Sequence, residues 1–169
     1  MESSSIADGV KRPLDPRLIQ LERVVGWIVT ASIAFGILIT LASVLVAASL
    51  PVWAIAALVL LWVAVTLALG WWLQRWPEIY YRHASYVVDA RGIEIRQGVV
   101  WRRVINVPRS RVQHTDVSQG PLERRFGLGT LIIHTAGTDY AVVTLHGLAH
   151  ETSLAIRDHL LPREGHDAV

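Results

Sequence analysis

The stretch RVQHTDVSQGPLERRFGLGTLIIHT, Arg111 to Thr135, decides the fold of the C-terminal half of this chain. Its two ends, Arg111–Val117 and Gly129–Thr135, mix β-branched, apolar and polar residues in the way that strands do. Between them the segment Ser118–Leu131, which we call the knuckle, carries three glycines, one proline and a pair of arginines. Glycine and proline interrupt regular structure, so the pattern predicts a strand, a tight corner and a second strand.

The knuckle has two interpretations. As a corner, the Gly120–Pro121 pair starts a short helical turn and Gly127 ends it. Leu122 and Phe126, four residues apart, then face the core together. As a binding element, the knuckle presents the Arg124–Arg125 pair to a ligand. The sequence leaves both open.

Further strands are predicted on both sides of this stretch. Upstream, short apolar runs separated by the turns DARG and RQG predict strands at Tyr86–Val88, Ile93–Arg96 and Val99–Val107. Downstream, Asp139–Leu145 predicts another strand, and apolar residues at helical spacing predict a helix over Ala149–Leu161. We therefore expect an α+β chain whose soluble part is an antiparallel β barrel or orthogonal sandwich closed by a C-terminal helix.

A long apolar block precedes this soluble part. Val24–Gln74 contains no charged residue over 51 positions, and Ala47–Pro51 breaks it into two spans. Each span exceeds the roughly 20 residues that one helix needs to cross a bilayer. A buried soluble hairpin would need more surrounding protein than the chain offers, and the apolar core of a signal peptide is shorter. The block therefore predicts a transmembrane helical hairpin.

The flanking charges predict its orientation. Basic residues precede the first span and follow the second, and the turn between the spans has none. The positive-inside rule then places both termini in the cytoplasm, so we expect a multi-pass protein of the cell inner (cytoplasmic) membrane. We divide the chain into a disordered N-terminus over 1–15, a juxtamembrane helix with the hairpin over 16–75, and a cytoplasmic domain over 76–165.

Several function classes find no support in the sequence. The chain has no cysteine, so thiolate catalysis and thiolate metal sites are excluded. His146 and His150 are four apart, but Gly147 breaks the helix that would align them. His114 and His134 could be neighbours on adjacent strands, yet we find no carboxylate of suitable spacing to complete a set. We predict no enzyme, cofactor or metal site, and no nucleic-acid binding, because the arginines have almost no aromatic neighbours.

The run Ile105–Gly137 resembles the bacterial pleckstrin-homology-like (PH-like), membrane-flanked domain of the YdbS-like proteins. The matching positions are Pro108, Arg111, Gln113, Gly120, Pro121, Leu122, Arg124 or Arg125, Phe126, Gly127, Leu128, Leu131 and Thr135. The resemblance implies a PH-like fold over 76–165, with two orthogonal sheets and a closing helix, behind a hydrophobic hairpin. It also implies a partner: a larger membrane protein with several copies of the same domain.

Arginines outnumber acids in the middle of the soluble part. Seven arginines and two acids lie between residues 96 and 125. The guanidinium of arginine can bind phosphate or carboxylate through two hydrogen bonds, so this excess of arginines predicts a binding face. The candidate binding residues are Arg102, Arg103, Arg111, Arg124 and Arg125. Because the chain is already anchored, we favour a scaffold module that assembles with another membrane protein. The alternative is binding of anionic lipid headgroups, and an oligomer stays open.

Overall fold

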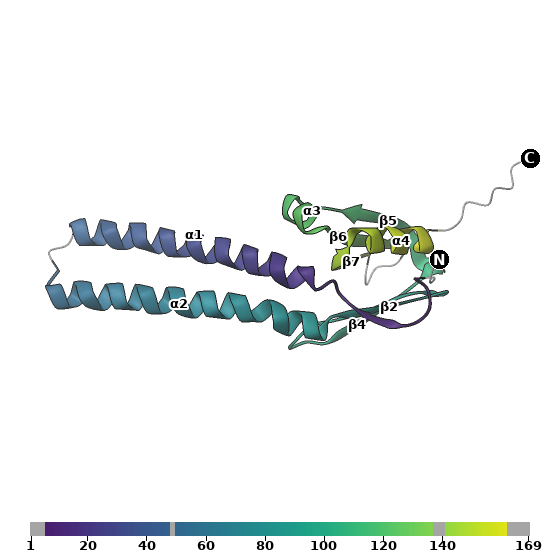
Figure 1. Cartoon of the computed structure of the whole chain (residues 1–169), viewed down its shortest axis with the longest axis horizontal. Helices are drawn as coiled ribbons and strands as arrows, with labels where there is room; N and C mark the ends of the chain where they lie inside the picture. The colour runs from purple at the N-terminus through teal and green to yellow at the C-terminus, as the bar shows by residue number, and fades with distance from the viewer. Residues whose placement is uncertain (1–5, 48–49, 137–140, 162–169) are drawn as a thin grey trace, which may run out of the picture. The chain divides into compact units, whose positions relative to one another are not determined.

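The computed structural model describes residues 6–47, 50–136 and 141–161. The chain divides into two compact units (Figure 1). The helical unit is Glu22–Glu78. The sheet unit combines the chain on both sides of it, Met1–Leu21 and Ile79–Val169. The helical unit is thus inserted into the sequence of the sheet unit.

Two long helices, α1 (Arg17–Ala47) and α2 (Val52–His83), carry the apolar block. Both are long and apolar enough to cross a membrane, and almost none of their apolar residues is buried, unlike the core helices of a soluble domain. They pack closely where one helix presents glycine: a Cβ on Gly26 would contact Leu73, and one on Gly70 would contact Thr30. The small residues therefore serve packing within the hairpin.

In the residues that the structure describes, the sheet unit has seven strands, which form two antiparallel sheets. The first sheet has the order β1-β2-β3-β4, with β1 Lys11–Pro13, β2 Ser85–Asp89, β3 Gly92–Gln97 and β4 Arg103–Pro108. The second has the order β5-β6-β7, with β5 Val112–Ser118, β6 Leu128–Thr135 and β7 Val142–Ala149. A 3₁₀ turn, η1 (Arg109–Arg111), joins them, and α3 (Pro121–Phe126) joins β5 to β6.

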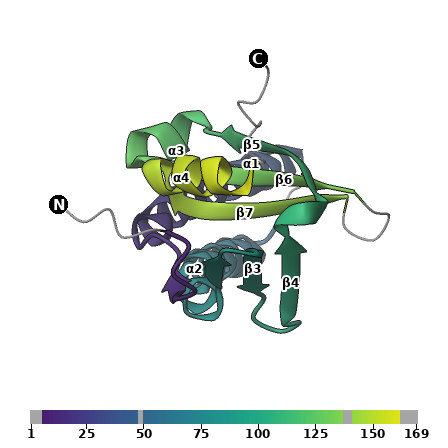
Figure 2. The ribbon, with the colours of Figure 1, turned by 90° about the vertical axis from the view of Figure 1, so that its right-hand side faces the viewer.

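The C-terminal helix α4 (His150–Leu160) completes this unit. It packs against all three strands of the second sheet (Figure 2). Ile156 and Leu160 of this helix are fully buried. No strand pairing joins the two sheets in the part of the chain that the structure describes. The fold is therefore the expected α+β, PH-like arrangement with a C-terminal helix, as a sandwich rather than a closed barrel.

The segment before the hairpin corrects one prediction. We expected residues 1–15 to be disordered, but Lys11–Pro13 form β1 and pair with β2 in the register Pro13↔Ser85. Leu14 is only 2% exposed, and the Asp15 amide donates to the Gly147 carbonyl at 2.8 Å. The prediction failed because a strand of three residues is too short to show an alternation of apolar and polar residues. Its partner strand, β2, also lies far away in the sequence, after the transmembrane hairpin. Residues 1–5 lie outside the described residues.

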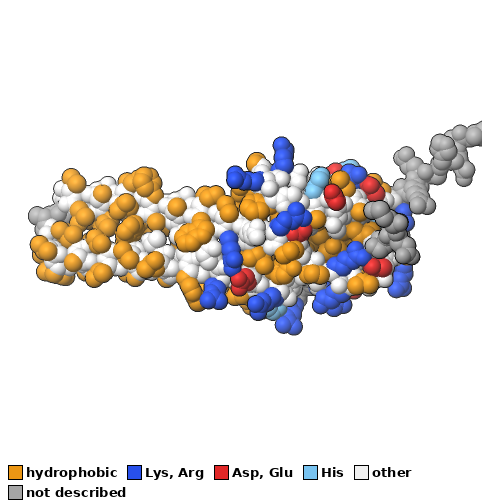
Figure 3. Space-filling view, viewed as in Figure 1, with side chains coloured by type: hydrophobic (Ala, Val, Ile, Leu, Met, Phe, Trp, Pro, Cys, Tyr) orange, Lys and Arg blue, Asp and Glu red, His pale blue; other side chains and the backbone are white. Residues whose placement is uncertain are grey.

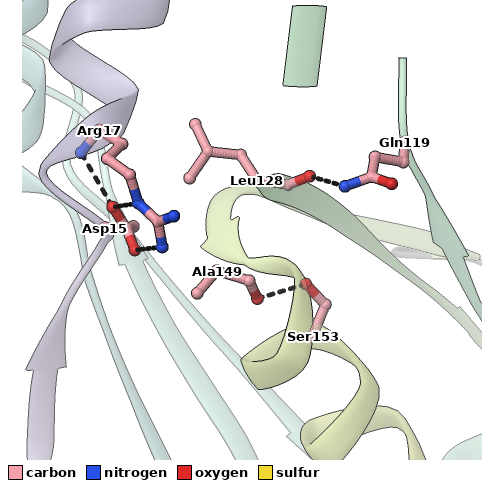
Figure 4. A network of polar contacts seen from close by, with 6 residues as sticks. All are labelled: Asp15, Arg17, Gln119, Leu128, Ala149 and Ser153. Carbon is pink, nitrogen blue, oxygen red and sulfur yellow. Dashed lines mark hydrogen bonds and ion pairs between the residues drawn. The ribbon is translucent and has the colours of Figure 1, made fainter. Parts of the chain in front are cut away.

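Asp15 fixes the start of α1. Its carboxylate accepts hydrogen bonds from the Arg17 amide at 2.9 Å and from Arg17 Nε and Nη2 at 3.0 and 2.8 Å (Figure 4). The hydrogen-bonded Arg17 guanidinium is the main cause that lowers the pKa of Asp15; burial opposes it, and the hydrogen bond from the Arg17 amide lowers the pKa further. A carboxylate near a helix N-terminus is also favoured by the helix dipole.

This lowered pKa predicts a pH dependence of stability. A depressed carboxyl pKa stabilises the folded state above the ordinary aspartate pKa of about 3.9, and the gain is lost as pH falls through the folded pKa. We expect Asp15→Asn to reduce the loss of stability of the full chain on acidification below pH 5, and Arg17→Gln to do the same. Urea unfolding in detergent at pH 7 and below pH 4 measures this. Wild type and Asp15→Asn losing stability in parallel would contradict it.

Candidate functional site

A hollow of about 570 Å³ lies in the sheet unit and is lined by three separate segments. These are β1, the last residues of α2 with the start of β2, and the β3–β4 hairpin. We call it the basic groove, because its lining includes five cations and no carboxylate: Lys11, Arg82, Arg96, Arg102 and Arg103. His83, Ser85 and Gln97 add further polar groups.

The cations of the basic groove are exposed and mostly unpaired. Arg96 Nε donates to Glu94 Oε1 at 2.5 Å, which balances one charge. Among the described residues, no ion pair involves the other four cations. Lys and Arg side chains gather on the sheet unit, whereas the visible face of α1 and α2 is largely apolar (Figure 3). Such a groove attracts anions, and its arginines suit phosphate.

Local backbone geometry shapes one wall of the groove. The ladder between β3 and β4 ends at the pair Gln97↔Arg103, which places the residues around this pair beside one another. Gly98, at the end of this ladder, has φ +109°, and a Cβ there would overlap the Trp101 carbonyl oxygen. Only glycine fits such a turn, so Gly98 sets the path of the backbone between β3 and β4.

The structure separates the five predicted binding arginines. Arg102 and Arg103 line the basic groove. Arg111 ends η1, and the Arg124–Arg125 pair lies on α3 beside the second sheet. All five are exposed. The predicted face is thus not one surface. Lys11, Arg82 and Arg96 also line the basic groove, and the sequence analysis did not include them among the candidate binding residues.

The knuckle forms a capped corner. Gly120 precedes α3, and its amide donates to Glu123 Oε2 at 2.7 Å. The other Glu123 oxygen accepts from Thr130 Oγ1 at 2.6 Å, which ties α3 to β6. Gly127 ends the helix at φ +66°, in the left-handed region that favours glycine. The corner interpretation thus describes the local structure, without deciding what the two arginines do.

The remaining motif residues have local structural positions. Pro108 ends β4 opposite Gly92, and Gln113 is exposed on β5. Pro121 occupies the first turn of α3. Phe126 is half-buried, whereas Leu122 is exposed, so the prediction that both face the core is wrong for Leu122. Leu122 lies in the first turn of α3 beside Pro121, which is exposed as well.

Two histidines and one aspartate lie close together on the second sheet. His114 and His134 are cross-strand partners with ring centroids 5.7 Å apart. Asp116 lies beside both: its oxygens are 2.8 Å from His114 Nε2 and 3.6 Å from His134 Nε2. Asp116 lies on the same side of β5 as His114, because residues two apart share one face of a strand. Within the described residues, no group of three or more such side chains is arranged to hold a metal ion.

Comparisons with known proteins place this geometry in a family. The model of the family "Bacterial PH domain" matches residues 18–164. The UPF0699 transmembrane protein YdbS of Bacillus subtilis (strain 168) is 41% identical over 70 residues, which cover 41% of this chain and 43% of that protein. This chain thus spans less than half of that relative, and no solved structure matches it significantly. The YdbS-like resemblance is confirmed, and the chain belongs to the bacterial PH domain family.

Proposed function

We propose that this chain is a membrane-anchored module whose PH-like sheet unit binds anionic phospholipid headgroups in the basic groove. The observation that carries the proposal is the groove lining of five exposed cations without a carboxylate. A phosphodiester is the anion that most phospholipids present at the membrane surface. The proposal reverses our sequence-based preference for a protein partner, because the fold assembles the cations into one hollow. It assigns the chain no catalytic activity and no cofactor.

The membrane topology forms part of the proposal. β1 precedes the hairpin, β2 follows it, and the two strands pair, so both ends of the hairpin lie on one side of the membrane. A single crossing would separate β1 from β2, and therefore α1 and α2 cross together. The basic flanks, including Lys11 and Arg82, place that side in the cytoplasm by the positive-inside rule. The protein is then a multi-pass protein of the inner membrane with both termini cytoplasmic.

Anchoring does not make headgroup binding redundant. A tethered domain meets its ligand at a high effective concentration, so weak contacts suffice to hold it in one orientation. A basic residue near an anionic leaflet gains roughly 1 kcal/mol, and the gain falls away within a Debye length. Headgroup binding would therefore orient the sheet unit on the membrane and select the lipids around the hairpin, instead of recruiting the protein.

The test compares two double variants of the full-length chain. In neutral detergent, native mass spectrometry measures the apparent Kd for short-chain phosphatidylglycerol and for phosphatidylcholine of equal chain length. We expect wild type to prefer phosphatidylglycerol, and Arg102→Gln with Arg103→Gln to weaken that binding about 30-fold, from about 1 kcal/mol for each arginine. The matched control, Arg124→Gln with Arg125→Gln, removes the same charge from α3.

The controls decide between sites. Equal losses from both double variants would mean that total charge, and not the groove, binds lipid. Unchanged phosphatidylglycerol binding in the groove variant would reject the proposal. Raising the salt concentration should also weaken the wild-type preference, because exposed charges are screened.

A second candidate function is assembly with another membrane protein that carries repeated PH-like domains. β4 is an edge of the first sheet, and on its outer side the described residues place no strand. Val104 on β4 is largely exposed, and an open edge can pair with an extended segment of a partner. We would expect a stoichiometric complex that survives high salt, is lost with Val104→Lys and is kept in the groove variant.

A further inference from the structure

The turn between β3 and β4 exposes two apolar side chains. We call residues 98–102 the hairpin tip. Val100 is 76% exposed and Trp101 is 84% exposed, more than any other described tryptophan. Exposing this apolar surface to water is unfavourable, and its burial in an apolar environment would stabilise the tip. Single exposed apolar residues are ordinary, but an adjacent valine and tryptophan at a projecting turn form a contact surface.

The hairpin tip is held in place by its own turn. The last pair of the ladder, Gln97↔Arg103, lies at the base of the tip. Gly98 has φ +109° at the start of the tip, where a Cβ would overlap the Trp101 carbonyl oxygen. The backbone on both sides of Trp101 is thus fixed by strand pairing and a tight turn.

The chemistry around the tip points to a membrane surface as its partner. Arg102 and Arg103 follow Trp101 directly and line the basic groove together with Arg82, which lies in the last turn of α2. Tryptophan prefers the membrane–water interface, and arginine extends its charged head to the phosphates beside it. The apolar tip is therefore suited to the edge of the acyl layer, and the arginines that follow it are suited to the neighbouring layer of phosphates.

We propose that the hairpin tip inserts Val100 and Trp101 into the interfacial layer of the leaflet from which α2 emerges. Arg102 and Arg103 then stay at the level of the phosphates. A soluble protein partner fits less well, because the groove beside the tip is lined by the helix that carries the chain out of the membrane. The inference rests on the membrane topology proposed above, and not on which headgroup the groove selects.

The absence of native cysteine permits a direct test. The full chain with Val100→Cys, labelled with an environment-sensitive fluorophore, is placed in phosphatidylcholine nanodiscs, with and without phosphatidylglycerol. We expect quenching by lipids that carry a shallow nitroxide and protection from aqueous iodide. The matched control is Val142→Cys, a valine on β7 that is 52% exposed. A label at position 142 should be quenched by aqueous iodide and not by the nitroxide lipids. Iodide access at position 100 equal to that at position 142 would overturn the inference.

A second variant separates insertion from mere proximity. Trp101→Asp in the Val100→Cys background should reduce nitroxide quenching severalfold, because a carboxylate is costly in the interface, whereas Trp101→Phe should retain it. Both changes lie on the surface, so equal urea midpoints show that folding is unaffected. Unchanged quenching in Trp101→Asp would reject insertion. Tip quenching in neutral lipid without phosphatidylglycerol binding would reject only headgroup selection. Headgroup binding without tip quenching would reject only this inference.

Discussion

Replacing Gly92 with alanine is expected to destabilise the sheet unit by about 3 kcal/mol, the upper range for overpacking a tight site. Gly92 starts β3 and pairs with Pro108 of β4. A Cβ there would overlap the Val107 carbonyl oxygen and lie 2.9 Å from Pro108 Cα. Both atoms belong to the backbone, so no change of rotamer relieves the overlap, and the strands must separate.

The matched control for Gly92→Ala is Gly120→Ala. Gly120 has φ −69°, and a Cβ there would lie 3.5 Å from Glu123 Oε2, an ordinary contact. Its cost should be about 1 kcal/mol or less, the typical loss at a helix N-cap. Urea unfolding of the full chain in detergent, followed by pulse proteolysis, measures both variants. Similar costs for the two glycines would show that the β3–β4 strands yield easily at Gly92.

Replacing Leu14 with alanine is expected to cost about 2–5 kcal/mol, as for other buried leucines. Leu14 is almost fully buried, between the β1–β2 pairing and the hydrogen bond from Asp15 to Gly147. The segment before the hairpin therefore supplies part of the core of a domain whose other strands follow the hairpin. The cavity left by alanine would lie inside that core.

Val10→Ala is the control for this second prediction, since Val10 belongs to the same segment and is 55% exposed. Surface substitutions of this kind stay within about 0.5 kcal/mol. The same unfolding assay applies. If Leu14→Ala cost no more than Val10→Ala, the N-terminal segment would be an accessory to the domain instead of part of its core.

The sequence predicted the elements that have a strong local pattern. The uncharged run predicted both long helices, although α2 continues to His83 through Pro77 and its charged, aromatic end. Strands β2, β3, β5 and β6 and helix α4 lie within one residue of their predicted bounds. The predicted strand Val99–Val107 was too long, because its first residues form the hairpin tip and β4 begins at Arg103.

The candidate site was less predictable, because the basic groove is built from segments far apart in the sequence. Counting charge along the chain combined Arg102, in the turn before β4, with Arg124, on α3 beside the second sheet. The same count omitted Lys11, since β1 reaches the groove through a pairing across the whole hairpin. A local pattern carries no information about such a pairing.

The placement of β1 before the hairpin has a consequence for how the protein is made. The ribosome releases β1 first and β2 only after both helices, so the first sheet cannot close until the hairpin is complete. In the membrane topology proposed above, a chain that left one helix uninserted would hold β1 and β2 on opposite faces of the membrane, and Leu14 could not be buried. Such a chain could not close its first sheet, and we expect its unfolded domain to be exposed to proteolysis.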